Sequence, residues 1–525
     1  PSAPSGVTAR IVKDGVLVSW TPSPPGSPGV TNYIVHAGQN SCPVTVPAGA
    51  NSAVMPIVPG QTVVVPAVRA ASPYGYSPDA LAATPLNVRG RADGAHRAVQ
   101  FLQFSDFHGA LEASDTNIGA SVLASALAAD RSRVKPTFTV SSGDNFGGSP
   151  AISSAFEEVP SVKVLNAMHL DVSTFGNHEH DRPLAHLRQM IDLSTFKWVV
   201  SNYSTLAPLQ GKRNGAKDFV LVRRDGITVG FVGMNTEDAP SLVFPTNFKY
   251  GRNLANSIEV SSSTAGLVKG AKEARAAGAQ IVVALMHQGF AAYVDGQPSG
   301  KLIERAAQLP GVDLVYGGHS HLEYAGIING KPVTEGPNSG KEYSRTTTCL
   351  DTSTGKVLGS NVDYLDRAKV AAISADARVA AIVSQYKSRL GTRLDQRVGV
   401  VDGLFPRGGT PAVERSEETP MGDFLADALR DELGTDFVLL NGGGIRDTLP
   451  SGGYQPVDKS LRRPGPGRTG PYDVTLGDLQ AVFPFGNNTA TTTITGDGLW
   501  SALELGLSGW PADGRFAQVS GLRYT

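Results

Sequence analysis

The sequence predicts a multidomain protein in which an all-β domain precedes two α/β units. The chain has 525 residues, whereas a single domain usually has about 100–200. Residues 1–88 hold 14 of the 35 prolines and no glutamate, which sets them apart in composition from the rest of the chain. From residue 98 onward, apolar strands alternate with alanine-rich helical segments, a pattern typical of α/β domains.

Short β-rich runs separated by turn residues fill residues 1–88 and predict a small antiparallel sandwich. Strands are expected at 15–20, 32–35 and 62–68. The pattern resembles a fibronectin type III domain with Trp20 and Tyr33 in its core, and another seven-stranded sandwich is the alternative. Residues 89–97 are polar and punctuated by glycine, and we interpret them as a linker.

Helices and a further α/β unit are expected in the rest of the chain. Helices are expected at 120–131 and 264–277, and helical periodicity near 363–390 predicts a helix that joins two lobes. A further α/β unit begins near residue 396. Residues 460–470 place three arginines among proline and glycine, so we interpret them as a solvated loop, with an anion-binding loop as the alternative.

Composition and charge exclude several classes of protein. Lys and Arg number 46 against 47 Asp and Glu, and no basic stripe is present, which argues against binding of a nucleic-acid polymer. Apolar runs such as 281–286 are far shorter than the roughly 20 residues that span a bilayer. Cys42 and Cys349 are more than 300 positions apart in segments predicted to be different domains, so we expect no disulfide between them. The chain begins at Pro1 without a signal segment, and we expect a processed or trimmed product.

Polar side chains follow five predicted strands of the second unit, where open α/β sheets place their ligand sites. Each short motif alone is also typical of an ordinary turn, but six of the ten histidines fall in these motifs. In chain order, the motifs supply Asp106 and His108 after 99–104, Asp144 after 137–140, Asn177, His178 and Asp181 after 172–175, His287 after 281–286, and His319 and His321 after 312–316.

Oxygen and imidazole donors without thiolates suit Zn²⁺, Mn²⁺ or Fe²⁺ rather than a structural zinc site of cysteines. Seven such donors can hold two ions if one carboxylate bridges them. A two-metal site clamps phosphoryl oxygens and lowers the pKa of a bound water toward neutrality. The donor set therefore predicts phosphoester hydrolysis.

These motifs resemble the calcineurin-like metallophosphoesterases and, with the C-terminal unit, the 5′-nucleotidase / UDP-sugar hydrolase family, over residues 98–525. The resemblance implies an α/β/β/α sandwich at 98–362, a linker helix at 363–392 with a hinge near 363–371, and a smaller α/β substrate-binding domain at 393–525.

The resemblance also implies two divalent ions (Zn, Mn, Mg, Co or Fe) and assigns their ligands. The first ion would be bound by Asp106, His108, Asp144 and His321, and the second by Asn177, His287 and His319, with Asp144 bridging. His178, paired with Asp181, would stabilise charge on the phosphate and assist the leaving oxygen, while Glu179 and His180 would be structural.

Four residues of the last unit match the family's substrate-binding positions. Arg415 and Arg446 would meet phosphate or carboxylate-like charge, Asn441 the base, and Phe485 one face of the base. The family continues with a further Asn-Phe…Gly-Gly-Asp stretch, whereas this chain ends at Thr525, so we expect either a truncated end or a pocket that is built differently.

The resulting expectation is an extracytoplasmic, metal-dependent hydrolase of a nucleotide or nucleotide sugar, 2′,3′-cyclic nucleotides included. One alternative keeps the metals but makes the substrate a phosphodiester or another phosphomonoester. A second alternative is a catalytically inert surface-binding protein. In each case the N-terminal sandwich is a candidate for contact with a cell surface or polysaccharide.

Overall fold

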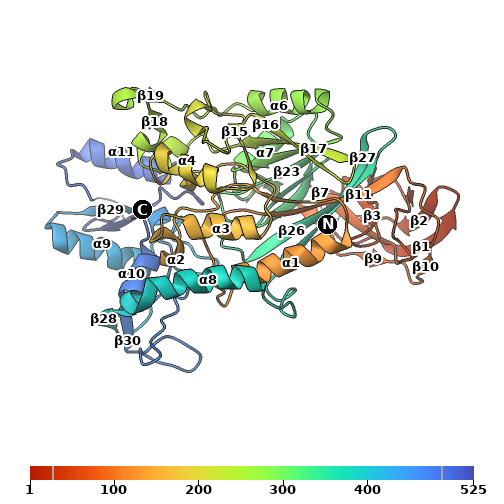
Figure 1. Cartoon of the computed structure of the whole chain (residues 1–525). Coiled ribbons are helices and arrows are strands. Elements are labelled where there is room, and N and C mark those ends of the chain that lie inside the picture. Colours follow the sequence, from red (N-terminus) through yellow and green to blue (C-terminus); the bar gives the residue numbers. More distant parts are fainter. Residues whose placement is uncertain (26–28, 486–488, 525) are drawn as a thin grey trace. The chain divides into compact units, whose positions relative to one another are not determined.

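The computed structural model describes residues 1–25, 29–485 and 489–524, and the chain divides into two compact units. The first unit contains residues 1–107, 115–146 and 161–380, and the second contains residues 108–114, 147–160 and 381–525. Figure 1 labels their elements. Among the described residues, no helix is both long and apolar enough to cross a membrane.

The N-terminal part of the first unit is an all-β domain, as expected. Its sheets enclose one apolar core in which the rings of Trp20 and Tyr33 lie 5.4 Å apart. The expected strand at 62–68 is two strands instead, because Pro66 has no N–H to continue the ladder. The strands are β1 (Ser5–Val12), β2 (Gly15–Thr21) and β5 (Ser52–Met55) in one sheet; β4 (Val44–Pro47), β3 (Asn32–His36), β7 (Ala67–Ser72), β8 (Gly75–Tyr76) and β9 (Ala80–Leu81) in another; and the pair β6 (Val63–Val64) and β10 (Leu86–Asn87).

Two mixed sheets form the remainder of the first unit, and their facing sides share one buried core that includes Phe101, Phe138 and Phe231. In sheet order, the first holds β15 (Ala216–Lys217), β14 (Lys197–Val199), β13 (Val172–Ser173), β12 (Thr137–Ser141), β11 (His96–Phe104), β26 (Glu342–Asp351) and β27 (Lys356–Asp366). The second holds β16 (Phe219–Arg224), β17 (Ile227–Met234), β20 (Ile281–Met286), β23 (Leu314–Tyr316), β25 (Lys331–Glu335) and β24 (Tyr324–Ile328).

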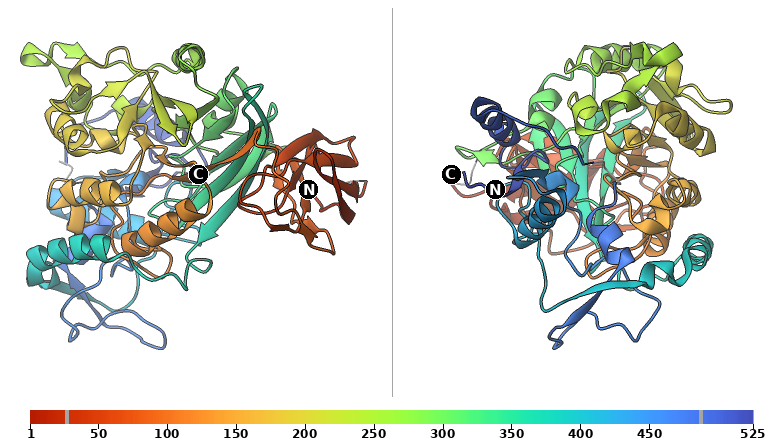
Figure 2. Two further views of the ribbon diagram at one scale, coloured as in Figure 1. Left: turned by 45° about the vertical axis from the view of Figure 1, so that its right-hand side comes forward. Right: turned by 90° about the vertical axis from the view of Figure 1, so that its left-hand side faces the viewer.

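Helices cover the outer faces of these sheets (Figure 2). α6 (Ala265–Ala276) and α7 (Lys301–Ala307) bury apolar residues in a second core against the second sheet. α1 (Ala120–Arg133) and α4 (Leu184–Leu193) lie along the first sheet. Pairing is parallel from β11 through β12 to β13 and from β17 through β20 to β23, so the carboxyl ends of neighbouring strands meet at one edge of each sheet.

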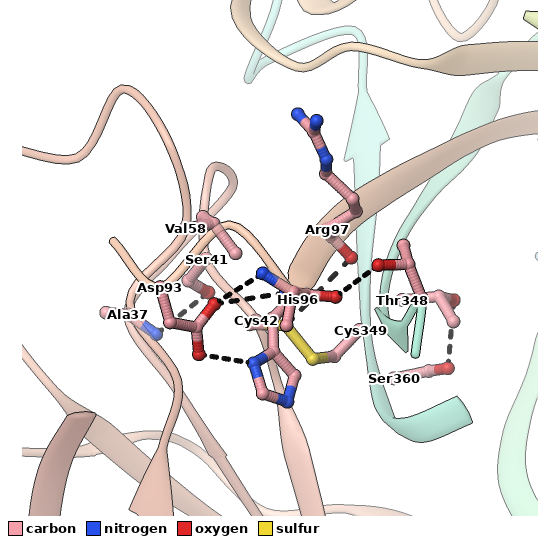
Figure 3. The surroundings of a disulfide bond; sticks show 12 residues. Ala37, Ser41, Cys42, Val58, Asp93, His96, Arg97, Thr348, Cys349 and Ser360 are labelled. Atoms are coloured by element: carbon pink, nitrogen blue, oxygen red, sulfur yellow. Dashed lines mark hydrogen bonds and ion pairs between the residues drawn. A yellow bond between two sulfur atoms is a disulfide. The ribbon is translucent and has the colours of Figure 1, made fainter. Parts of the chain in front are cut away.

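The expectation for the cysteines was wrong: Cys42 and Cys349 form a disulfide (Figure 3). The pair joins the N-terminal domain to β26, and both side chains are fully buried. The long separation along the sequence did not predict the pairing of the two cysteines, because the N-terminal domain packs directly on the sheet that contains β26. Arg69 of β7, for example, donates to the carbonyl of Val362 in β27 at 2.9 Å.

The expected linker helix starts later than the sequence indicated. Residues 363–366 are the end of β27, and the helix α8 occupies Ala377–Leu390. The periodic apolar residues before residue 377 therefore do not form this helix, because the segment first has to complete its pairing with β26. The hinge expected near 363–371 remains a prediction.

The C-terminal part of the second unit is smaller and mixed in structure. Its loop at 460–470 is largely exposed, as expected, and two of its arginines form ion pairs: Arg462 with Asp473 at 2.6 Å and Arg463 with Asp478 at 2.6 Å. Its elements are β28 (Arg397–Val401), α9 (Pro420–Leu433), β29 (Val438–Asn441), β30 (Tyr472–Thr475), α10 (Leu476–Val482), α11 (Gly496–Leu507) and β31 (Ala517–Ser520). Short elements elsewhere in the chain are α2 (Ala151–Ser154), α3 (Val159–Ala167), α5 (Ala239–Leu242), β18 (Lys249–Tyr250), β19 (Asn256–Ser257), β21 (Tyr293–Val294) and β22 (Gln297–Pro298).

Candidate metal centre

A buried cluster of carboxylate, amide and imidazole groups forms where the parallel strands end. Asp144 follows β12 and His287 follows β20, and Oδ2 of the first lies 3.1 Å from Nε2 of the second. The same Nε2 atom lies 3.2 Å from Oδ1 of Asn177 and 3.9 Å from Oδ1 of Asp106. With His319, which follows β23, the pair Asp144 and His287 offers ligand atoms that all lie within 4.8 Å of one another.

Asp106 anchors a second group of donors. Its Oδ1 lies 3.4 Å from Nε2 of His321, and both of its carboxylate oxygens accept from the backbone N–H of His319 at 3.1 Å. His108 follows Asp106 two residues later and joins Asp106 and His321 in a group that could hold an ion. The Nδ1–H of His108 donates to the carbonyl of Gly147 at 2.8 Å, so its Nε2 is the atom that can coordinate an ion.

The electrostatics of the cluster suit a cation. His287 is fully buried, and its Nδ1–H donates to the carbonyl of Ser142 at 2.9 Å, which directs Nε2 at the oxygen donors. Burial alone would lower the pKa of His287, but the carboxylates of Asp144 and Asp106 raise it to about 10. Two carboxylates in a buried site therefore stabilise positive charge at this point, and imidazole with carboxylate is the donor set of borderline divalent ions.

Glycines let the ligand loops approach one another. A Cβ atom on Gly176 would lie 2.1 Å from Oδ1 of Asp144 and 2.7 Å from Nε2 of His287. A Cβ atom on Gly318 would lie 2.9 Å from Oδ2 of Asp106. A side chain at either position would occupy space that the donors need.

Strained backbone is concentrated at the same loops. Five of the seven expected ligands have positive φ angles, a region that costs non-glycine residues about 1–3 kcal/mol each. Such strain persists where the surrounding structure over-determines it, and it is typical of functional sites. The five are Asp106 (50°), His108 (46°), Asp144 (51°), His319 (87°) and His321 (63°).

Glu179 supports two of these loops from behind. It is buried, and its carboxylate accepts from the backbone N–H groups of Gly176 at 2.6 Å, Asp144 at 2.9 Å and Asn145 at 2.8 Å. Burial and the nearby charge of Asp144 raise the pKa of Glu179 to about 7, while the N–H donors oppose this rise. Its contacts agree with the structural role expected for it, and burial also lowers the pKa of His180, to about 3.

His178 and Asp181 lie beside the cluster as a pair. They lie at the two ends of a single 3₁₀ turn, and Nδ1 of His178 lies 2.8 Å from Oδ1 of Asp181. The backbone N–H of His178 donates to Oδ1 of Asp144 at 2.8 Å. The carboxylate of Asp181 thereby fixes the orientation of the His178 ring. Nε2 of His178 then points away from Asp181, as contact with a substrate requires.

The expected substrate residues lie in the second unit. Nη2 of Arg446 lies 3.3 Å from Nε2 of His108, and its guanidinium carbon lies 5.6 Å from the ring centre of Phe485. Asn441 is exposed and donates to the carbonyl of Gly514 at 3.5 Å, and Arg415 is half-buried. Gly486 and Asn487, which belong to the motif around Phe485, lie outside the described residues.

Comparison with protein families assigns these two groups of residues to two different family models. Residues 99–323 match the family model for calcineurin-like phosphoesterases, and residues 397–525 match that for the 5′-nucleotidase C-terminal domain. The chain carries these two domains in this order. All seven expected metal ligands fall in the phosphoesterase domain, and the four expected substrate residues fall in the nucleotidase C-terminal domain.

Individual relatives extend over most of the chain. The cell wall protein Lmo0130 of Listeria monocytogenes is 28% identical over 485 residues, which cover 81% of this chain and 58% of that protein. The endonuclease YhcR of Bacillus subtilis is 25% identical over 462 residues, which cover 83% of this chain and 35% of that protein. The chain thus spans only part of these curated relatives.

A solved structure shows the same fold. The 5′-nucleotidase precursor of Thermus thermophilus superposes with a TM-score of 0.66 at 22% identity, over 81% of this chain and 82% of that one. Family members use two divalent ions, and the donors of the phosphoesterase domain fit such ions in type and position.

Neither the family pattern nor the sequence motifs pointed to Glu335, a buried carboxylate that contacts the histidine loops.

Proposed function

We propose that this protein hydrolyses phosphoester bonds of nucleotides in a metal-dependent reaction. The observation that carries the proposal is the cluster of Asp144, His287 and the half-buried His319 at the carboxyl edge of the sheets. Asp106, His108, Asn177 and His321 would complete a site for two divalent ions, with Asp144 shared between them. When bound, such ions polarise phosphoryl oxygens and lower the pKa of a coordinated water.

The chain's own residues supply the rest of the chemistry. Asp181 holds the imidazole of His178 so that it can donate a hydrogen bond to phosphoryl oxygen and a proton to the leaving oxygen. Arg446 presents a guanidinium beside His108, where a phosphate group can accept paired hydrogen bonds. Phe485 would stack on the base, and Arg415 and Asn441 would complete substrate recognition.

Two further proposals concern the whole chain. We propose that it works outside the cytoplasm, because a buried disulfide is typical of proteins from oxidising compartments. We also propose that the N-terminal domain is fibronectin type III-like, since Trp20 and Tyr33 pack together in the core of its two main sheets.

A phosphodiester substrate is the second candidate, since one relative is an endonuclease. Against a polymer stands the net charge of −1 without a basic stripe. Substrate class is therefore tested with a panel: 5′-AMP, UDP-glucose, 2′,3′-cyclic AMP, bis-nitrophenyl phosphate and single-stranded DNA, each with Mn²⁺ or with chelator.

We expect Mn²⁺-dependent phosphate release from 5′-AMP to be the fastest reaction of the panel. Arg446→Ala should raise KM for 5′-AMP about tenfold or more, since a charged hydrogen bond to phosphate is lost. Arg462→Ala is the matched control, because this arginine pairs with Asp473 instead. Cleavage of DNA or bis-nitrophenyl phosphate without release from 5′-AMP would establish the phosphodiesterase alternative, and no metal-dependent cleavage at all would favour the inert binding protein.

A further inference from the structure

Glu335 is a fully buried carboxylate outside the expected ligand set. It is the last residue of β25 and pairs across to Tyr324, the first residue of β24. Its Oε1 accepts from the hydroxyl of Ser320 at 2.7 Å and from the backbone N–H of Ser320 at 3.2 Å. Its Oε2 accepts from the backbone N–H of Phe290 at 2.6 Å. One side chain thus connects two loops that are 30 residues apart.

Both of these loops carry expected metal ligands. Ser320 separates His319 from His321, and Phe290 follows His287 by three residues. The loops touch directly, because a Cβ atom on Gly289 would lie 2.5 Å from Cβ of Ser320. The carboxylate of Glu335 therefore fixes the spacing between the single histidine of one loop and the two histidines of the other.

The N-terminal domain contacts the strand that pairs with Glu335. The hydroxyl of Tyr324 donates to the carbonyl of Pro73 at 2.7 Å, in the turn between β7 and β8. The ring of Tyr324 stacks on Phe290 with centroids 4.9 Å apart. Tyr293 packs on the same Phe290 ring at 5.2 Å and stacks on Tyr74 at 6.4 Å. An aromatic row thus runs from this turn to the His287 loop.

We propose that Glu335 is a positioning residue for the metal centre and that the Pro73–Tyr74 turn braces it through Tyr324. This inference rests on the proposed function, because it takes the three histidines as ligands. A carboxyl group suits the position, since its two oxygens accept from three donors at once. Groups that orient ligands from behind typically change metal affinity by about 10–100-fold when they are lost.

The test is calorimetric titration of Mn²⁺ into the metal-free full-length chain, with folding of each variant verified by circular dichroism. Glu335→Gln should bind Mn²⁺ about 10–100-fold more weakly, because an amide nitrogen cannot accept from the Phe290 N–H. Ser320→Ala should weaken binding as well. The double variant should bind no more weakly than Glu335→Gln alone, since both changes remove one shared contact. Glu342→Gln, a buried glutamate on β26, is the control and should bind within twofold of wild type.

Tyr324→Phe tests separately whether the contact between Tyr324 and the Pro73–Tyr74 turn stabilises the metal centre. It keeps the ring stack on Phe290 and removes only the hydrogen bond to Pro73, so we expect Mn²⁺ binding about threefold weaker. If this variant binds Mn²⁺ with wild-type affinity, the proposed role of the Pro73–Tyr74 turn is wrong. If a folded Glu335→Gln variant binds Mn²⁺ with wild-type affinity, the proposed positioning role of Glu335 is wrong. If Glu335→Gln does not fold, Ser320→Ala decides in its place. Failure of the wild type to bind Mn²⁺ or to hydrolyse 5′-AMP would instead count against the proposed function.

Discussion

His178 is proposed to act as a proton donor rather than as a metal ligand, and the two roles predict different results. Its Nδ1 pairs with Asp181 at 2.8 Å, while its ring also lies near His108 and Asp144, whose ligand atoms are within 4.8 Å of its own. We therefore predict that His178→Ala lowers kcat by about 10²–10⁴-fold, the usual contribution of a general acid, while Mn²⁺ affinity changes less than threefold. Asp181→Asn should show a smaller loss in kcat, because the ring remains but loses its orientation.

Steady-state kinetics on 5′-AMP and calorimetric titration of Mn²⁺ check this prediction together. A loss of metal affinity that matches the loss of kcat would make His178 a ligand and would contradict the assignment.

Glu342 leads to a prediction about pH and stability. Burial, reinforced by the charges of Glu323 and Asp366, raises the pKa of Glu342 to about 8. Between the ordinary glutamate pKa of about 4.5 and this value, the unfolded chain has released a proton that the folded chain keeps. Folded-state stability is therefore highest below about pH 4.5 with respect to this group and falls as the pH rises toward 8.

Glu342→Gln removes this loss. We expect the unfolding free energy of the variant, relative to that of wild type, to be higher at pH 9 than at pH 5 by a few kcal/mol, to order of magnitude. The melting temperature of the variant relative to wild type should rise in the same direction. Equal differences at both pH values in thermal melts would show that Glu342 ionises normally.

At the scale of elements, the close approach of loops decides the site. Gly176 lies between β13 and the turn that carries Asn177, and a Cβ atom there would meet both Asp144 and His287. We predict that Gly176→Ala weakens Mn²⁺ binding by at least tenfold. Gly399→Ala is the control, since nothing lies within 4 Å of a Cβ atom at that position. Unchanged metal binding in a folded Gly176→Ala variant would mean that Asp144 and His287 are not held in the observed positions when ions bind.

Elements with a strong local signal could be predicted from the sequence. The strand at 281–286 has the bounds that its apolar run indicated, since all six residues are buried between helices and a second sheet. The run at 172–175 is a strand only at its first two residues, because the chain turns there to bring Asn177 into the site. Motif order placed the expected ligands at strand ends, since parallel pairing brings those ends together.

Other features of the fold and of the site could not be predicted, because they depend on contacts between residues that are far apart in the sequence. Glu335 has no motif around it, and its role follows only from the pairing of β24 with β25 and from the distance to Ser320. The late start of α8 depended on the length of β27, which is set by its partner β26 rather than by its own periodicity.

At the scale of the whole molecule, the disulfide is the feature that the sequence did not predict. It closes a loop of 307 residues between the N-terminal domain and β26. We predict that the double variant Cys42→Ser and Cys349→Ser lowers the unfolding free energy by about 2–5 kcal/mol. Phosphate release at 25 °C should remain, because the disulfide contacts none of the expected ligands.

Thermal melts of the wild type with and without reductant provide the matching comparison. The melting temperature of the oxidised wild type should exceed those of the reduced protein and the double variant. Identical values for all three would mean that the bond does not form in the protein in solution, and the case for an oxidising compartment would then fail.

Metal stoichiometry tests the two-metal site at the sheet edges most directly. The full-length chain is saturated with Mn²⁺, dialysed and measured by elemental analysis, beside Asp144→Asn and a sample treated with chelator. We predict two ions per wild-type chain, fewer in Asp144→Asn, and loss of 5′-AMP hydrolysis in both the variant and the chelated sample. A wild-type chain that retains no ion, or one that hydrolyses 5′-AMP equally well after chelation, would contradict the account.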